Sequence, residues 1–311
     1  YFVDAQAVTY ATATFCFPYS EAAVAGAGLS EETLMVWHQP PGVSTWVDVT
    51  ASHDTAGNRI CARDSVSQVV ITGMTGPPLA HVRYLAEGAT SRVFDASVAL
   101  LNLSPDTAAN AVLRFQRADT SSRIRYVSVP PLGRRTVTVK AVPEMADAEF
   151  STVVEGDQPL VVDRTMTWDA AGYGAHAETS VAAPATTWYL AEGATHSGFN
   201  LFYLIQNPHP TDAANVRVRY LLPNGAPVEK VHVVPAHSRY NIWVDYEQVP
   251  ADSGLTPLAD TDVSAMIESL NGIAIIVERA MYREWPGQFF GAGHESTGVT
   301  APALQWFLAE G

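Results

Sequence analysis

One string in this sequence has the residue types of a hydrolase. Gly291-Ala-Gly-His-Glu-Ser-Thr-Gly298 brings a serine, a histidine and a carboxylate together. The Gly-x-Ser-x-Gly spacing of a nucleophile elbow is absent, and no second histidine follows His294 four residues later, as a helical zinc site needs. The corresponding earlier string, Gly172-Tyr-Gly-Ala-His-Ala-Glu-Thr, contains His176 but no serine. We expect both histidines to hold glycine-rich loops, and we expect the chain not to be an enzyme.

A metal or cofactor site is the next candidate. Asp260-Thr-Asp-Val-Ser264 begins like a calcium loop, but Ala265 stands where such a loop requires glycine, and Asn271 replaces the glutamate of position twelve. The sequence has no Cys-x-x-Cys pair, phosphate-binding glycine loop or basic stripe. We expect no cofactor and no resident metal, and the acidic surface leaves loosely held calcium open.

A glutamate and an arginine recur in apolar surroundings. Leu-Ala-Glu-Gly occurs three times, with its glutamate at Glu87, Glu192 and Glu310, and an arginine recurs in an apolar strand at Arg164 and Arg279. A buried ion without a partner is costly, so a repeated charge of this kind is usually paired. We expect Glu–Arg pairs that fix each module or the junction between modules; solvated charges are the alternative.

Aromatic residues mark the same boundaries. Trp188 and Trp306 precede the second and third Leu-Ala-Glu-Gly copies. We favour packing at a module joint over a sugar-stacking face. A carbohydrate site would need a flat row of exposed rings, and the candidates for it are Trp243, Tyr246, Tyr282 and Trp285.

The two cysteines, Cys16 and Cys61, both lie in strand-like stretches of the first eighty residues. A lone pair within one small module predicts a disulfide formed in an oxidising compartment, which closes a loop for a few kcal/mol. Two separate buried thiols are the alternative.

Internal repetition determines the organisation of the chain. Tyr84-Leu-Ala-Glu-Gly-Ala-Thr90 returns as Tyr189-Leu-Ala-Glu-Gly-Ala-Thr195, and a third time as Phe307-Leu-Ala-Glu-Gly311. A shift of 105 positions keeps the first two copies in register without a gap from Tyr84 to Val139. The two copies therefore share one fold.

The periodicity within each copy is two, which is typical of strands. Val216–Leu222 alternates, a Pro-Asn-Gly turn follows at 223–225, and Val228–Val234 alternates again, so a hairpin is predicted. Ser264-Ala-Met-Ile267, the turn at 271–272 and the apolar run 273–277 predict a second hairpin. Many short strands with frequent turns predict an all-β protein of tandem antiparallel sandwiches.

Composition and charge narrow the function. The 311 residues are 47% hydrophobic but only 16% charged, and 32 acidic against 18 basic residues give a net charge of −14. Such a surface repels phosphate backbones and anionic lipids, which argues against nucleic-acid partners. No run of about twenty apolar residues occurs, so no membrane insertion is expected.

These motifs together resemble a known repeat. Tyr189-Leu-Ala-Glu-Gly-Ala-Thr195, Asn207-Pro, Glu278-Arg-Ala-Met-Tyr282 and Gly-His-Glu-Ser resemble a tandem repeat of large secreted bacterial proteins. The resemblance implies an Ig-like fold and an extracellular or cell-surface location, with no catalytic residues to transfer. The copy from Tyr84 departs from the pattern, because it lacks the Asn-Pro pair.

Four segments are expected: residues 1–80, a partial module with the disulfide; 81–187 and 188–303, two repeat sandwiches; and 304–311, the first strand of a third repeat or an inter-subunit strand. Tandem modules act as spacers or as subunits of filaments and surface layers. We therefore predict a structural or adhesive surface protein whose partners are copies of the repeat, with a cell-surface glycan as a second partner class. A carbohydrate-binding accessory module is the alternative function.

Overall fold

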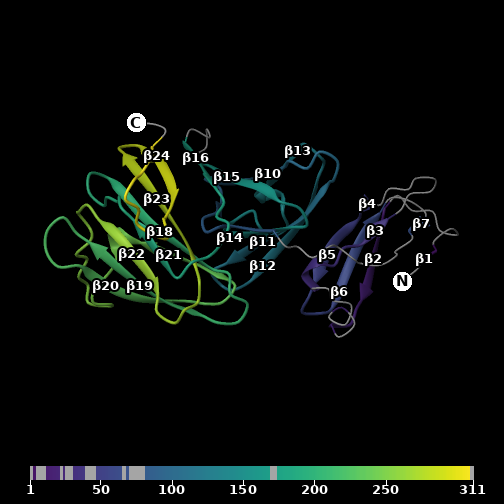
Figure 1. Ribbon diagram of the computed structural model, residues 1–311, viewed down its shortest axis with the longest axis horizontal. Coiled ribbons are helices and arrows are strands. Elements are labelled where there is room, and N and C mark those ends of the chain that lie inside the picture. Colours follow the sequence, from purple (N-terminus) through teal and green to yellow (C-terminus); the bar gives the residue numbers. More distant parts are fainter. Residues whose placement is uncertain are drawn as a thin grey trace.

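The described strands pair antiparallel throughout, which confirms the predicted all-β class and the sandwich architecture. In this computed structural model, the described residues are 3–4, 12–21, 24, 31–38, 47–64, 68–69, 81–168 and 174–308. Two sandwiches follow a group of N-terminal strands along the long axis of the molecule (Figure 1). Residues 73–78, where the sequence suggests a linker, lie outside the described residues.

The first sandwich has two sheets. One has the strand order β13-β10-β15-β16, and the other has the order β12-β11-β14-β8, with β9 also pairing with β14. The bounds are β8 His81–Leu85, β9 Ala89–Thr90, β10 Phe94–Asn102, β11 Ala109–Arg117, β12 Ser122–Val129, β13 Gly133–Thr138, β14 Ala148–Gly156, β15 Leu160–Trp168 and β16 Gly174–Thr179, with the 3₁₀ segment η2 at Val139–Ala141.

The second sandwich repeats this arrangement. Its sheets have the orders β21-β18-β23-β24 and β17-β22-β19-β20, so each strand has the same neighbours as its counterpart in the first sandwich. The bounds are β17 Thr187–Leu190, β18 Phe199–Asn207, β19 Ala214–Leu221, β20 Val228–Val234, β21 Ser238–Trp243, β22 Ser264–Ser269, β23 Ile276–Trp285 and β24 Gln288–Thr297, with η3 at Val244–Tyr246.

One predicted hairpin forms and the other does not. β19 and β20 pair across the turn that contains Gly225, whose φ of 99° suits glycine. The strands on either side of Gly272, β22 and β23, belong to different sheets. A strand has only two hydrogen-bonding edges, and β17 and β19 occupy both edges of β22. The turn therefore carries the chain from one layer to the other.

Each sandwich has its own hydrophobic core between its sheets. The period of two places every second residue inside, as in β19, where Val216, Val218 and Tyr220 are fully buried. The core of the second sandwich also contains Ala86 and Trp168, which belong to the first. The two cores are therefore continuous at this point.

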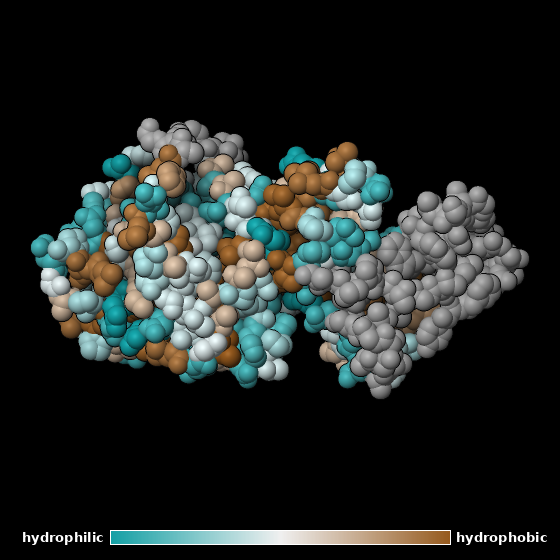
Figure 2. Space-filling view, viewed as in Figure 1, coloured by the Kyte–Doolittle hydropathy of each residue, from teal (hydrophilic) through white to brown (hydrophobic). Residues whose placement is uncertain are grey.

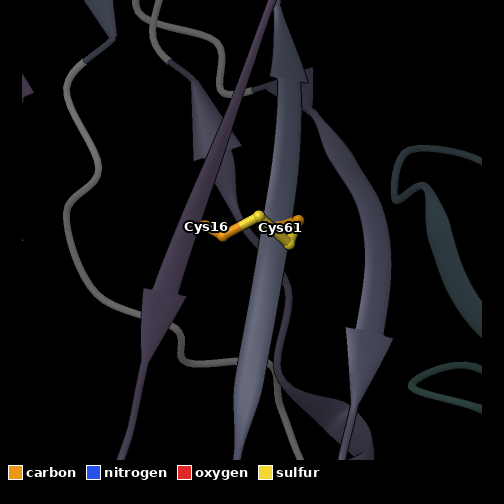
Figure 3. The surroundings of a disulfide bond; sticks show 2 residues. All are labelled: Cys16 and Cys61. Carbon is orange, nitrogen blue, oxygen red and sulfur yellow. A yellow bond between two sulfur atoms is a disulfide. The ribbon is translucent and has the colours of Figure 1, made fainter.

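The N-terminal part contains a three-stranded sheet of order β2-β6-β5 (Ala13–Pro18, Arg59–Asp64, Thr50–Asp54). The other N-terminal pairs are β3 (Trp37–His38) with β4 (Val47–Asp48) and β1 (Val3–Asp4) with β7 (Gln68–Val69), and η1 spans Glu31–Thr33. Cys16 and Cys61 face each other on β2 and β6 and form the predicted disulfide (Figure 3).

Hydrophobic and hydrophilic residues alternate in small patches over the visible face of both sandwiches (Figure 2). The most exposed large hydrophobic side chains belong to the C-terminal segment, at Leu304, Phe307 and Leu308. In the part of the chain that is described, no helix is long and apolar enough to cross a membrane.

Candidate functional site

The loop that follows β8 and the loop that follows β17 make the same ionic contact. Arg164 of β15 donates through Nη1 to the carbonyl oxygen of Glu87 at 2.7 Å, and its Nη2 lies 3.2 Å from the Glu87 carboxylate. In the second sandwich, Arg279 donates to the carbonyl of Glu192 and lies 2.9 Å from its carboxylate. The recurring glutamate and arginine thus lie against each other once in each sandwich.

The glycine of Leu-Ala-Glu-Gly permits this loop to lie close to its own sandwich. A Cβ atom on Gly88 would stand 2.3 Å from the Phe150 ring, and one on Gly193 would stand 2.7 Å from the carbonyl oxygen of Val263. Contacts this short exclude a side chain at either position. The backbone of each loop can therefore approach the sandwich and present its glutamate to the arginine.

The two pairs differ in what covers them. The second sandwich brings Glu278 of β23 and Glu295 of β24 to Arg164. The Oε2 atom of Glu278 lies 2.9 Å from Nη1 of Arg164, and the Glu295 carboxylate contacts Nη2. The side chain of Arg164 is fully buried. One guanidinium group therefore meets three carboxylates, two of which come from the other sandwich.

Glu278 also binds the loop directly. Its carboxylate accepts the backbone N–H of Ala86 at 2.9 Å and that of Glu87 at 2.8 Å. Burial alone would lower the pKa of Arg164, but the charges of Glu278 and Glu87 outweigh it and raise this pKa. Because each buried carboxylate oxygen needs donors, these two amides and the guanidinium together make the burial of Glu278 tolerable.

Tyr282 and His176 extend the network on one side. The hydroxyl of Tyr282 donates to Oε1 of Glu87 at 3.1 Å and lies 3.0 Å from Nε2 of His176. Burial lowers the pKa of His176, although the nearby Glu87 opposes this shift. Nε2 of His176 faces the tyrosine oxygen, and its Nδ1 lies 3.4 Å from the Glu295 carboxylate. Burial, reinforced by Glu87, raises the pKa of Tyr282 and keeps it protonated.

Aromatic rings surround the ionic cluster. The Trp168 side chain donates through Nε1 to the carbonyl oxygen of Phe290 at 2.5 Å, across the two sandwiches. The Tyr282 ring stacks on Phe290 with centroids 4.5 Å apart and meets Trp168 edge-on at 5.1 Å. Phe94 and Phe202 complete the layer. This apolar shell excludes water and strengthens the ionic contacts inside it.

A second line of contacts lies beside the cluster. Arg239 of β21 is 3.0 Å from the carboxylate of Glu149 on β14. The amide of Gln206 donates to that of Gln116 at 3.0 Å, and Gln116 in turn lies 3.4 Å from the His237 ring. The two sandwiches therefore contact each other at two separate polar clusters. Two points of contact restrict the rotation of one sandwich relative to the other.

The N-terminal part docks on strands β11 and β12 of the first sandwich. Arg114 of β11 lies 2.7 Å from the carboxylate of Glu32. The ring of His53 on β5 lies 3.0 Å from the hydroxyl of Tyr126 on β12 and 2.9 Å from that of Tyr19. Burial lowers the pKa of His53 to about 4. The sequence patterns do not indicate this contact.

Other candidate residues lie away from the junction. Trp188 is buried within the second sandwich, where its Nε1 donates to the Ile275 carbonyl, so it does not plug the joint. His294 is exposed, and Trp306 is 59% exposed. Glu310 lies outside the described residues. His176 is the one predicted histidine that reaches the cluster among the described residues.

The serine, histidine and glutamate of the hydrolase-like string do not form a catalytic group. They are consecutive residues of strand β24, where successive side chains point to opposite faces. Glu295 faces Arg164, whereas Ser296 accepts a hydrogen bond from Arg279 at 2.9 Å. The alternation places Glu295 on the opposite face from His294 and Ser296, so the three groups do not converge, and the Ser296 hydroxyl is bound by Arg279 instead.

Three groups of the cluster have the chemistry of metal ligands. One ligand atom each of Glu87, His176 and Glu295 lie within 4.8 Å of one another. The guanidinium of Arg164 already contacts both carboxylates, so it supplies positive charge where a cation would sit. The donor set therefore fits an ionic joint better than a metal centre.

The sequence patterns did not place Trp168, Glu278, Tyr282 or Glu295 in the cluster around Arg164. A signal for two of them lies in the differences between the copies. When Arg164 is aligned with Arg279 and His176 with His294, Tyr282 stands where the first copy has Thr167, and Glu295 where it has Ala177. Both junction residues thus differ from their counterparts in the first copy.

The aromatic row proposed for a sugar site is interrupted. Tyr282 is only 4% exposed, because it lies in the junction, so its assignment to a sugar-binding row is wrong. Trp243 and Tyr246 are exposed, but their rings stand at 89° to each other. Flat stacking on a sugar needs coplanar rings, and this pair does not provide them.

Comparisons with known proteins give little similarity. No family model matches the sequence, and no curated protein matches it. The crystal structure of Thermotoga maritima 1070 is 15% identical, with a TM-score of 0.31, over 33% of this chain and 93% of its own. The Anabaena sensory rhodopsin transducer is 19% identical, with a TM-score of 0.24, over 30% of this chain and 91% of its own. Likeness at these scores carries no argument about function.

Proposed function

We propose that this chain is a non-catalytic structural or adhesive module of an extracellular bacterial surface protein, within a filament or surface layer. The observation that carries the proposal is the closed junction around Arg164. Two domains of one chain move relative to each other by default unless their interface is large and well packed. Here, buried carboxylates from one sandwich bind the other, and rings seal the contact. Such a joint suits a spacer that has to hold its shape.

The disulfide supports the proposed location. Disulfides persist in oxidising compartments, and Cys16–Cys61 joins two strands of the N-terminal sheet. A content of charged residues of only 16% suits the same environment. Copies of the repeat are the proposed partners, because the chain already contains one repeat docked on another.

The proposal is tested on native material from the cell surface. Antibodies against the purified chain should label ordered filaments or lattices in electron micrographs of whole cells. Small-angle scattering of residues 1–311 should fit one extended shape with a fixed angle between the sandwiches. Labelling confined to the cell interior would overturn the location, and scattering that requires many sandwich orientations would overturn the spacer role.

Carbohydrate binding remains the second candidate, because Trp243, Tyr246 and Trp285 are exposed. The perpendicular rings of Trp243 and Tyr246 weaken it. Retention of the chain on surface glycans, abolished by Trp243→Ala and unaffected by Leu255→Ala, would favour this candidate over the spacer. No retention would remove it.

A further inference from the structure

The second sandwich carries an uncovered copy of the junction. Ala191, Glu192 and Arg279 form this acceptor end, and they correspond in the repeat to Ala86, Glu87 and Arg164. The side chain of Glu87 is 5% exposed, whereas that of Glu192 is 59% exposed. Ala86 is fully buried and Ala191 is exposed. The same loop is therefore covered in one sandwich and open in the other.

Two backbone N–H groups at the acceptor end have no hydrogen-bond partner among the described residues. In the first sandwich, Glu278 takes the amides of Ala86 and Glu87. Among the residues that the structure describes, nothing accepts a hydrogen bond from the amides of Ala191 and Glu192. The side chain of Arg279 is 8% exposed, whereas that of Arg164 is fully buried. A carboxylate placed as Glu278 is placed on the first sandwich would satisfy both amides.

The first sandwich cannot supply this carboxylate face. The positions of Glu278, Tyr282 and Glu295 are occupied in its repeat by Asp163, Thr167 and Ala177, which lack the reach and the second carboxylate. The Glu278 face of the chain itself is already buried against the first sandwich. A second copy of these same 311 residues therefore offers no free face of the required kind.

The third copy of the motif points to the occupant. The leucine of Leu-Ala-Glu-Gly is fully buried at Leu85 and 4% exposed at Leu190, but it is 89% exposed at Leu308. In both sandwiches this leucine is the last residue of the strand before the Ala-Glu-Gly loop, β8 or β17. The segment that ends at Leu308 has the sequence of such a strand, but no sheet covers Leu308. A module that began at Trp306 would bury Leu308 and lie directly beyond the second sandwich.

We propose that Ala191, Glu192 and Arg279 form a docking site for a further module of this repeat, one that carries a Glu278-type carboxylate and a Tyr282-type hydroxyl on its β23 strand. This inference rests on the proposed structural function and names its partner. Each added module would leave the next acceptor end open. An array would then extend in one direction, with a fixed angle at every junction.

The test extends the chain by one repeat. Phe307–Gly311 corresponds to Tyr189–Gly193, so residues 194–311 appended after Gly311 complete a module of the second type. Hydrogen exchange is followed by mass spectrometry on peptides that cover Ala191 and Glu192. We expect exchange at these two amides to slow by about 100-fold, towards the rates of Ala86 and Glu87 in the same molecule.

A matched pair of variants identifies the contact. Glu278→Gln in the appended copy alone should return the two amides to fast exchange, because the anionic acceptor is lost. Glu284→Gln in the same copy should change nothing, because Glu284 is exposed at the end of the same strand.

Two outcomes would overturn the proposal. In the first, the appended copy is folded while Ala191 and Glu192 still exchange as in the 311-residue chain. In the second, the appended copy is unfolded. The proposed docking would stabilise that copy through the same contacts by which the first sandwich stabilises the second, so an unfolded copy would contradict it. Either result leaves the scattering of residues 1–311 and the surface labelling unchanged, so it is distinguishable from a failure of the proposed function.

Discussion

Arg164 and Glu278 belong to different sandwiches, yet their Nη1 and Oε2 atoms lie 2.9 Å apart, and neither side chain has any exposed surface. An ion pair at the protein surface contributes little, because water and salt screen it. A fully buried pair behaves differently: it costs free energy to desolvate, and loss of one partner leaves the other uncompensated. The junction should therefore be sensitive to single substitutions on either side.

Arg164→Met should lower the free energy of unfolding of the joined sandwiches by about 3–5 kcal/mol, because three carboxylates then share a buried site without their cation. The measurement is urea unfolding followed by tryptophan fluorescence. Arg279→Met is the matched control: its partner Glu192 is 59% exposed, so water solvates the remaining carboxylate. If Arg279→Met lowered the free energy of unfolding as much as Arg164→Met does, the buried carboxylates of Glu278 and Glu295 would not be the cause of the destabilisation.

Tyr282→Phe removes only the hydroxyl that joins Glu87 and His176. We expect a loss of about 1–3 kcal/mol, because Glu87 and His176 each lose a buried partner while the ring packing remains. Tyr246→Phe, at a 65% exposed position, should change the free energy of unfolding by less than about 0.5 kcal/mol. Equal effects of the two substitutions would contradict a role for the hydroxyl in the junction.

Reduction of Cys16–Cys61 should destabilise the N-terminal sheet by about 2–4 kcal/mol, because the bond closes a loop between residues 45 positions apart. The two sandwiches contain no cysteine and should keep their stability. Limited proteolysis with and without dithiothreitol checks both statements. Cleavage that begins in the sandwiches after reduction would show that their folding depends on the N-terminal sheet.

Acid should weaken the docking of the N-terminal sheet on the first sandwich. Burial lowers the pKa of His53 from 6.5 to about 4, with Asp54 and Glu32 opposing the shift and Arg114 adding to it. Between these two pKa values the released sheet binds a proton that the docked sheet does not. The docking free energy is therefore complete above pH 6.5 and falls as the pH drops towards 4.

An NMR titration of the His53 ring should give a midpoint near 4 in the full chain. His53→Gln should remove the change in docking between pH 6.5 and 4, measured by small-angle scattering. A midpoint near the ordinary value of 6.5 would mean that His53 is not enclosed between Tyr19 and Tyr126 in solution.

Repetition made much of the fold predictable. The shift of 105 positions aligns homologous strands of the two copies, and the alternation in Val216–Tyr220 is the burial pattern of β19. The turn at Gly272 was less informative, because an Asn-Gly pair specifies a tight reversal but not which strands it joins. The neighbours of β22 had already taken both of its edges.

The sequence by itself determined the strand class, the two homologous copies and the recurring glutamates and arginines as candidates for ion pairs, because periodicity and repetition are properties of the chain. Only the tertiary structure decided that Glu278, Tyr282 and Glu295 converge on the first pair and leave the second open. Ala86 and Glu278 are 192 positions apart. Their contact depends on how the loop of one sandwich packs on the sheet face of the other, and no local pattern encodes that.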